Sequence, residues 1–287
     1  MVIIIGVIII FGGSFWGFNH AGGKLSTLIH ISEIATVGSM ALGSLVIMSP
    51  AKVIKQIFNM SLAIFKGAPF KKSDFEDLLK VMYELFVLGR RNGMIALEEH
   101  VMNPDGSSLF KKYPSFHNNH EALEFFCDGL RPIVDGRIKP DQLEPLMDKS
   151  MATVEHEKHT APFVLSKLAD ALPGFGIVAA VLGIVITMGV ISGDVSAVGE
   201  KIGAALTGTL IGVFMCYGIV GPIATNIEFY NHGEMTYLTC IKASVVAFAN
   251  GLPPLVAVEV GRRVLDEDMR PKASELETTL KTMGTQK

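Results

Sequence analysis

Charged residues are scarce in this sequence. Only 18% of its 287 residues are Asp, Glu, Lys or Arg, whereas 49% are hydrophobic. Because soluble domains usually carry about 25% charged residues, this composition favours a membrane protein. The net charge of −3 leaves no basic surface to displace counterions from phosphates. We therefore expect membrane lipid around the chain and no nucleic acid as a partner.

Motifs for metal, disulfide and cofactor chemistry are also missing. The three cysteines are widely spaced and include no C-x-x-C pair, so neither a disulfide framework nor a zinc site is expected. There is no phosphate-binding glycine loop and no nucleophile elbow. The histidine pairs, His117 with His120 and His156 with His159, lack the four-residue spacing of a zinc-protease helix. These absences argue against the alternative of a membrane-bound enzyme, and we predict no catalytic residue, metal or cofactor.

Four stretches are long, apolar and almost free of charge. They are residues 1–18, 29–48, 172–192 and 202–227. Each can cross a hydrocarbon core of about 30 Å as a helix. The first lacks the basic start and small-residue cleavage site of a signal peptide, so we expect it to be retained. The sequence therefore predicts an all-α polytopic membrane protein with four transmembrane helices, arranged as hairpins within residues 1–50 and 171–227.

The two remaining segments, 51–170 and 228–287, are polar and show helix-start signals. These signals are capping boxes at Ser73-x-x-Glu76 and Ser274-x-x-Glu277, a cap at Asn119 and a first-turn proline at Pro140. All Lys and Arg residues except Lys24 and Lys201 lie in these segments. By the positive-inside rule we expect a helical cytoplasmic domain at 51–170, a cytoplasmic helical extension at 228–287, and both termini in the cytoplasm.

Small residues recur every four positions along the two later spans. They are Gly176 and Ala180, Ala179 and Gly183, and Ala204, Gly208 and Gly212. Such ladders let helices approach closely in lipid. Packing within one hairpin would explain any single ladder, but several on consecutive helices favour an oligomer or a clasped partner helix.

Prolines and threonines mark the same helices. Pro222 follows a long helical run, so it should kink the helix and free a carbonyl, which then needs a new partner. Pro173 is either a first-turn proline or a second break. Thr207 and Thr209 offer hydroxyls, although threonine in a membrane helix commonly bonds to its own backbone.

Neither later span contains an ionisable side chain. Ion-coupled membrane proteins need a titratable group inside the bilayer. Glu33 is the one carboxylate within any of the four stretches, and its place near a helix start suggests an interfacial residue favoured by the helix dipole. If this chain conducts ions, a second subunit must supply the carboxylate.

Several motifs in order, together with the four-span topology, resemble the MotA family of flagellar stator subunits. They are Gly12-Gly13, Ala21-Gly22-Gly23, Gly89-Arg90-Arg91-Asn92-Gly93-Met94 with Leu97-Glu98, the run from Leu172 to Ala180, the run from Gly208 to Ala224, and Ala257-Val258-Glu259-Val260-Gly261-Arg262-Arg263. The resemblance implies a ring of five such subunits around a dimer of a MotB-type partner. That partner's membrane Asp would accept the permeating ion.

The resemblance also assigns roles to individual residues. It implies that Pro173 and Pro222 flank the partner's Asp, that Thr209 lines the ion path, and that Arg90 and Glu98 contact the rotor protein FliG. In the sodium-type relatives that this chain resembles, a threonine stands at the position of Ala180, and a second stands at the position of Thr209. Because sodium needs several oxygen ligands and a proton needs only a hydrogen-bonded wire, we expect protons. A sodium-driven stator and an ExbB- or TolQ-like energy transducer are the alternatives, although the latter normally has three spans.

Overall fold

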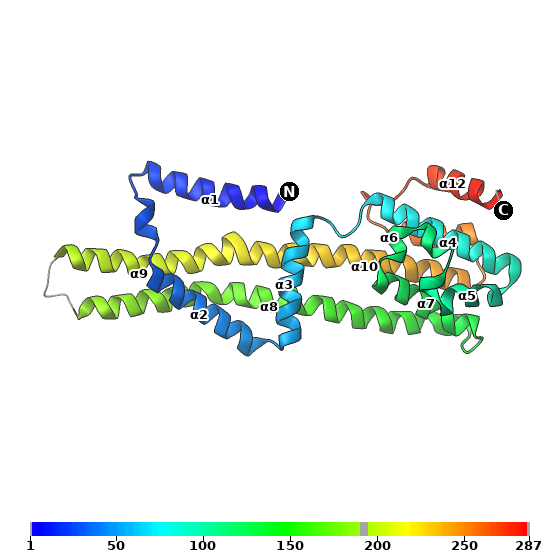
Figure 1. Ribbon diagram of the computed structural model, residues 1–287, viewed down its shortest axis with the longest axis horizontal. Coiled ribbons are helices and arrows are strands. Elements are labelled where there is room, and N and C mark those ends of the chain that lie inside the picture. The colour runs from blue at the N-terminus through cyan, green and yellow to red at the C-terminus, as the bar shows by residue number, and fades with distance from the viewer. Residues whose placement is uncertain (1, 190–194, 286–287) are drawn as a thin grey trace. The chain divides into compact units, whose positions relative to one another are not determined.

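The computed structural model describes residues 2–189 and 195–285, and within them the chain is helical with no strand (Figure 1). The α-helices are α1 (Val2–His20), α2 (Ile31–Met48), α3 (Ala51–Ala63), α4 (Lys72–Asn92), α5 (Glu98–Met102), α6 (Pro114–His117), α7 (His120–Val134), α8 (Pro140–Met188), α9 (Val195–Met215), α10 (Gly221–Ala249), α11 (Pro254–Arg263) and α12 (Ala273–Thr285). Short 3-10 turns connect several of them, and a π-helical turn, Cys216–Val220, joins α9 to α10. The predicted all-α class is confirmed.

The chain folds as two compact units. The first comprises Met1–Gly67 and Glu157–Tyr230, and the second comprises Ala68–His156 and Asn231–Lys287. The boundaries differ from the sequence segments at residues 50, 170 and 227, because α8 and α10 continue without a break through the last two of these positions. Where the membrane begins and ends along these helices stays a prediction.

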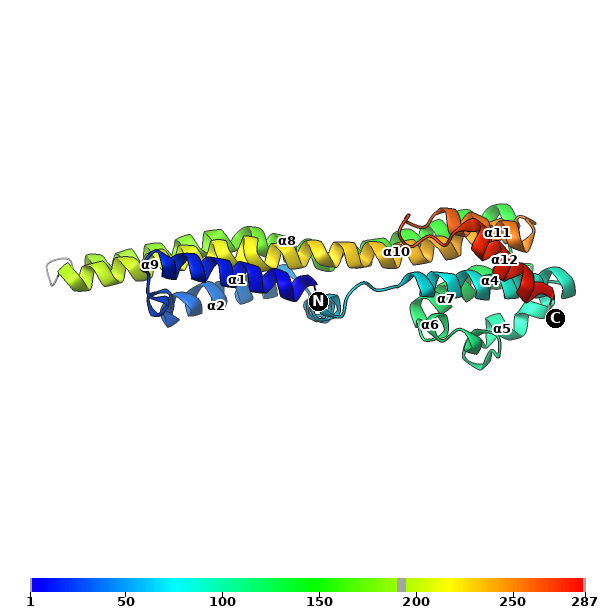
Figure 2. The same cartoon turned by 90° about the horizontal axis from the view of Figure 1, so that it is seen from above.

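Among the residues that the structure describes, four helical stretches are long and apolar enough to cross a membrane, in agreement with the predicted number, and all four lie wholly or partly in the first unit. In this unit α8 lies antiparallel to α9 and the start of α10, and the two views show them side by side (Figures 1 and 2). Helix α2 packs on α9, while Phe11 of α1 contacts Phe214 of α9 with ring centroids 5.1 Å apart. No residue of α1 is buried, as expected for a helix that faces lipid.

The second unit is built around an aromatic core. The rings of Phe86 and Phe248 stack with centroids 4.3 Å apart, and those of Phe70 and Tyr237 stack at 4.1 Å. The first stack joins α4 to α10, and the second joins the segment before α4 to α10. The apolar face of α4 predicted from its spacing is buried in this core. Aromatic burial of this kind stabilises a domain strongly, because each ring removes a large apolar area from water.

Helix starts were predicted with mixed success. Asn119 caps α7 by accepting a hydrogen bond from the backbone N–H of Ala122 at 3.2 Å, and Pro140 is the first residue of α8; both predictions are confirmed. Both capping boxes are wrong, because each helix begins before its serine. At α4 the backbone N–H of Lys71 donates to Asp74 at 2.8 Å, so an aspartate outcompetes the serine signal.

Candidate functional site

The two later membrane helices touch at glycines. A Cβ added to Gly212 of α9 would lie 2.5 Å from the carbonyl oxygen of Leu172 and 3.0 Å from the Cα of Gly176 on α8. A Cβ on Gly176 would lie 2.7 Å from the carbonyl oxygen of Gly208. Farther along, one on Gly183 would lie 2.8 Å from the Cβ of Ala205. Only hydrogen fits at these positions, so the backbones pack directly.

This packing corrects part of the sequence interpretation. The repeated small residues had favoured an oligomer or a partner helix, but Gly176, Gly183, Gly208 and Gly212 are all used inside one hairpin. The simpler explanation, helix packing within the chain, therefore accounts for these four glycines. The described parts of α8 and α9 also carry exposed apolar side chains that are not used in this packing. They include Ile177, Val181, Val185, Leu206 and Val213.

Ala180 and Thr209 lie on facing helices at nearly the same level. A Cβ on Gly208, the residue before Thr209, would be 3.4 Å from the backbone nitrogen of Ala180. Ala180 is buried and Thr209 is half-buried. The Thr207 hydroxyl donates to the carbonyl of Gly203 at 3.0 Å, the self-bonding expected of a membrane threonine. The structure thus brings two of the predicted ion-path residues together.

The two prolines are not at that level. Pro173 lies inside the uninterrupted helix α8, so a first-turn role for it is wrong. Pro222 is exposed and follows the π-helical turn. Leu172, the residue before Pro173, packs beside Gly212 of α9. Pro222 lies ten residues beyond Gly212, which is about 15 Å along a helix. The prolines therefore mark two depths of one hairpin.

The π-helical turn is the local consequence of Pro222. Proline has no N–H, and its ring clashes with the carbonyl four residues earlier. Here the backbone shifts register instead, and the N–H of Gly221 donates to the carbonyl of Cys216, five residues before it. A Cβ on Gly221 would lie 2.8 Å from that oxygen. The backbone is thus irregular just before Pro222, and the kink and freed carbonyl expected there stay predictions.

Glu33 is buried within the first unit. Although it is in the first turn of α2, its side chain is only 8% exposed, and a Cβ on Gly208 would lie 3.3 Å from its Oε2. The hydroxyl of Ser32 donates to Oε1 at 3.2 Å. Within this unit the carboxylate is therefore packed against α9 at Gly208, while its depth in the membrane stays a prediction. Nothing near Glu33 in the sequence indicates this contact, which depends on the missing side chain of Gly208.

In the second unit, Arg90 and Glu98 share one exposed corner. Arg90 is in the last turn of α4 and Glu98 is the first residue of α5. The chain turns between them at Gly93, whose φ is +83°, and Leu97 then folds back onto α4. Gly89 permits this return, because a Cβ there would be 3.0 Å from Leu97. Both charges are therefore exposed on either side of this turn, and their contact with the rotor stays a prediction.

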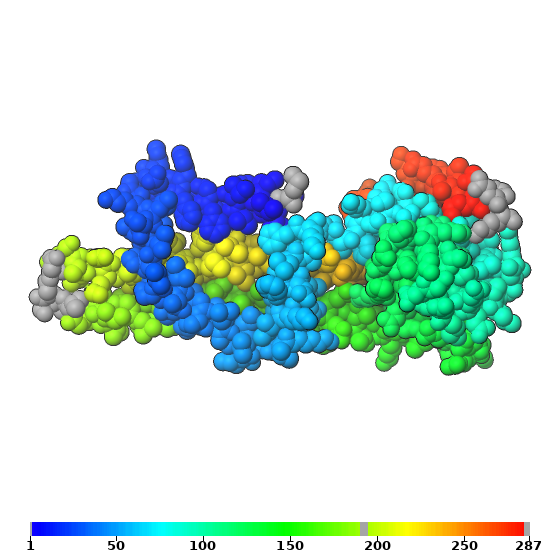
Figure 3. All heavy atoms as spheres, viewed as in Figure 1, coloured from blue at the N-terminus to red at the C-terminus, as the bar shows by residue number. Residues whose placement is uncertain are grey.

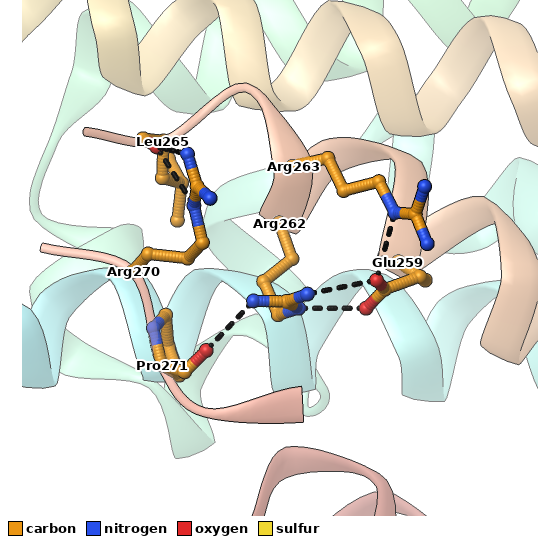
Figure 4. Close-up of polar contacts among 6 residues, drawn as sticks. All are labelled: Glu259, Arg262, Arg263, Leu265, Arg270 and Pro271. Atoms are coloured by element: carbon orange, nitrogen blue, oxygen red, sulfur yellow. Dashed lines mark hydrogen bonds and ion pairs between the residues drawn. The ribbon is translucent and has the colours of Figure 1, made fainter. Parts of the chain in front are cut away.

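The motif at residues 257–263 turns out to be structural (Figure 4). Glu259 accepts two hydrogen bonds from Arg262, at 2.6 and 2.8 Å, and one from Arg263 at 3.0 Å. Arg262 also donates to the carbonyl of Pro271 at 2.9 Å, which ties the segment before α12 to α11. The hydrogen bonds from Arg262 outweigh desolvation and lower the pKa of Glu259 to about 2.

Other reactive groups lie in the helical core of each unit. All three cysteines are free and buried, and burial raises the pKa of the Cys127 thiol to about 12. A thiol that stays protonated is a poor nucleophile and a poor metal ligand. Among the described residues, no group of three or more His, Cys, Asp or Glu is placed to hold a metal ion.

Comparisons with known proteins agree with this architecture. Residues 4–93 match the family described as Motility protein A N-terminal, and residues 117–238 match the MotA/TolQ/ExbB proton channel family. The chain is 32% identical to motility protein A of Salmonella typhimurium, covering 96% of this chain and 94% of that protein. It is 33% identical to chemotaxis protein LafT of Vibrio parahaemolyticus, covering 96% and 95%.

Two solved structures share the fold. The MotAB structure from C. jejuni aligns with a TM-score of 0.76 at 20% identity, covering 92% of this chain and 95% of that one. The flagellar MotAB stator complex from Bacillus subtilis aligns with a TM-score of 0.74 at 22% identity, covering 96% and 98%. The chain therefore belongs to the motility protein A family, the MotA-type stator subunits of the flagellar motor.

Proposed function

We propose that this chain, with a MotB-type partner, conducts protons across the bacterial inner membrane and converts their flow into torque on the rotor. The observation that carries this proposal is the hairpin of α8 and α9, which supplies a close-packed wall without any titratable side chain in residues 171–189 and 202–215. A carboxylate from the partner, placed against Ala180 and Thr209, would complete the path. The structural neighbours, which are MotAB complexes, support such a partner.

The assembly and orientation belong to the same proposal. Five copies would surround a partner dimer, with lipid on the outer face, and the apolar surface left exposed on α8 and α9 is available to both. The transmembrane hairpins would be 1–50 and 171–227, with 51–170, 228–287 and both termini in the cytoplasm. The distribution of Lys and Arg supports this orientation.

The ion is tested by swimming speed after each gradient is collapsed separately. Ala180 offers no hydroxyl oxygen, so one potential sodium ligand is absent from the level of Thr209. We expect motility to stop when the proton gradient is collapsed and to persist without a sodium gradient. Loss of motility with the sodium gradient alone would instead establish the sodium-driven alternative.

The rotor contact is tested by charge reversal. Arg90 and Glu98 are both exposed at one corner of the second unit, where complementary charges of FliG would meet them. We expect Arg90→Glu combined with Glu98→Lys to cut swimming speed severely, and matching reversals on FliG to restore it in part. Reversal of Lys71 and Lys72, exposed at the other end of α4, is the control and should have little effect. Normal swimming of the double reversal would exclude this corner as the contact.

A further inference from the structure

Helix α3 and the turn that follows it present three different faces. One face is buried, with Ile57 and Ile64 packed against Ala161, Leu165 and Leu168 of α8 and against residues of α10. The second face is apolar yet exposed, and comprises Phe58 (65% exposed), Leu62 (52%) and Phe65 (39%). The third is polar and carries Lys52, Lys55, Gln56, Asn59 and Lys66.

The exposed apolar residues of this segment lie on one side of it. Phe58, Leu62 and Phe65 follow one another at four- and three-residue spacing, so they form a continuous stripe on one side of the helix. Figure 3 shows α3 as an outward ridge on the viewed face of the first unit. Stripes of this kind mark a contact with a membrane or another protein. The lysines alongside the stripe can extend their ammonium groups away from it.

The position of α3 along the chain points to the membrane surface. Only Ser49 and Pro50 separate it from α2, which belongs to a candidate span ending at Met48. In Figure 1 α3 runs across α8 and α10, and in Figure 2 it is seen nearly end-on, so it would lie in the plane of a membrane that α8 crosses. The α8 residues that it contacts, up to Leu168, come directly before the charge-free run that starts at residue 171.

Exposed aromatic rings occur at the same depth. Phe163 of α8 is 49% exposed and Phe229 of α10 is 71% exposed, and both lie beside the α3 contact in sequence. At the far end of α1, Trp16 is 70% exposed. Aromatic residues gather at the two surfaces of a bilayer, because their rings suit the headgroup region. This second observation places α3 at one of those surfaces.

The polar face offers a site for an anionic headgroup. A groove of about 300 Å³ is lined by Lys52, Lys55, Gln56, Asn59, Met60 and Thr160. Glu157 also lines it and pairs with Lys52 at 3.5 Å. Both charges of that pair are mostly exposed, at 81% and 64%, so the pair contributes little and a phosphate can replace it.

We propose that α3 is a lipid-binding helix, with its apolar stripe in the acyl region and its lysines holding the phosphate of an anionic phospholipid. A basic residue near an anionic leaflet favours such lipid by about fivefold. Lys52 and Lys55 together should therefore enrich anionic lipid around α3 by about 25-fold. Assignment to the cytoplasmic leaflet rests on the orientation proposed above, whereas the binding does not.

The depth of α3 is tested with a fluorescent reporter. Trp16 is the one tryptophan of the chain, so Trp16→Phe with Phe58→Trp gives a single reporter once the partner's tryptophans are replaced by phenylalanine. The complex is reconstituted in vesicles of brominated phosphatidylcholine. Ile8→Trp on α1 and Ile95→Trp in the second unit, 63% and 78% exposed, are the membrane and water controls. We expect the Phe58 reporter to be quenched most by bromines near the headgroup. Quenching as weak as that of the Ile95 control would overturn the proposal.

The lipid preference is tested with the same reporter in mixed vesicles. Brominated phosphatidylglycerol should quench it far more than an equal fraction of brominated phosphatidylcholine. Lys52→Gln with Lys55→Gln should abolish most of that difference, while Lys71→Gln with Lys72→Gln should leave it unchanged. An equal response to both lipids in the unsubstituted protein would rule out the headgroup site. Efficient Phe58→Cys cross-linking between copies would show that a second protomer covers the stripe instead. Neither measurement requires ion flow, so a failed stator function would not affect them.

Discussion

At the residue scale, the closest helix approach rests on the absence of a single methyl group. Gly212→Ala places a Cβ against the backbone of α8, which cannot move away cheaply, so the hairpin must separate. We expect a destabilisation of about 1–3 kcal/mol, seen as a lower Tm of the purified complex in detergent. Gly203→Ala is the matched control on the same helix, because nothing lies within 4 Å of its added Cβ. Equal Tm values for the two variants would contradict this packing.

The charge cluster at Glu259 should give local stability a defined pH dependence. Its pKa falls from an ordinary 4.5 to about 2, so its contribution is fully present above pH 4.5 and is lost as pH falls toward 2. We expect the protection of amides in residues 264–283 against hydrogen exchange, measured relative to the intrinsic exchange rate at each pH, to fall over that range. Glu259→Gln should show fast exchange already at pH 7, because Arg262 then loses its charged partner.

Glu277→Gln is the comparison for that experiment. Glu277 also pairs with a cation, Lys281, but both side chains are about half exposed or more, so the pair contributes little. Its exchange profile should match that of the unsubstituted protein. If both variants exchange alike, the segment before α12 is not held by Arg262.

Glu33 shows where residue-level sequence reasoning ends. Its position near a helix start was visible in the sequence, and on that basis the helix dipole predicts a carboxylate in contact with water. Its burial depends on Gly208, some 175 residues later, whose missing side chain leaves room for the carboxylate. A tertiary contact of this kind leaves no periodic or local signal in the sequence.

At the element scale, the π-helical turn should be the part of the hairpin that Pro222 dictates. Pro222→Ala restores an N–H and removes the ring clash, so the register shift loses its cause and α9 and α10 can join as one regular helix. We expect the protein to insert normally but to drive rotation weakly, measured as the speed of tethered cells at equal membrane abundance. Pro140→Ala is the control, because a proline at the first position of α8 costs no hydrogen bond. Undiminished rotation would show that the turn is dispensable.

The number of membrane-spanning helices could be predicted from the sequence, but the residues at which the helices begin and end could not. The four apolar runs gave the number of spans, since a charge-free stretch of this length has few other stable forms. The extent of α8 could not be read in this way, because the helix passes through Pro162 and Pro173 and also through the change from polar to apolar residues at 171. A proline inside a helix removes one hydrogen bond and often ends the helix. Beside Pro173, α9 packs closely against α8, and this packing can hold α8 helical through the proline.

For the whole molecule, the absence of a titratable group from the α8–α9 wall makes a partner necessary. A bare charge in hydrocarbon is very unfavourable, and a potential of 100 mV supplies only about 2.3 kcal/mol per elementary charge. Where Gly176 meets Gly212 the two backbones touch, so one hairpin leaves no aqueous path between its own helices. Under the proposed function, a permeating ion therefore needs a carboxylate that lies against this wall.

The need for a partner can be tested by measuring proton uptake into reconstituted vesicles under an imposed membrane potential. Vesicles with the chain alone should take up protons no faster than empty vesicles, whereas vesicles with the chain and its MotB-type partner should take them up rapidly. Replacing the partner's membrane Asp with Asn should return the rate to the background while leaving the complex assembled, as judged by co-purification. Glu33→Gln in the complete complex separates the two carboxylates. Because Glu33 belongs to α2 and is buried against α9 at Gly208, its loss should slow the flux without abolishing it. Rapid uptake by the chain alone would mean that Glu33 carries the proton, and the partner would then serve as an anchor instead of the carrier.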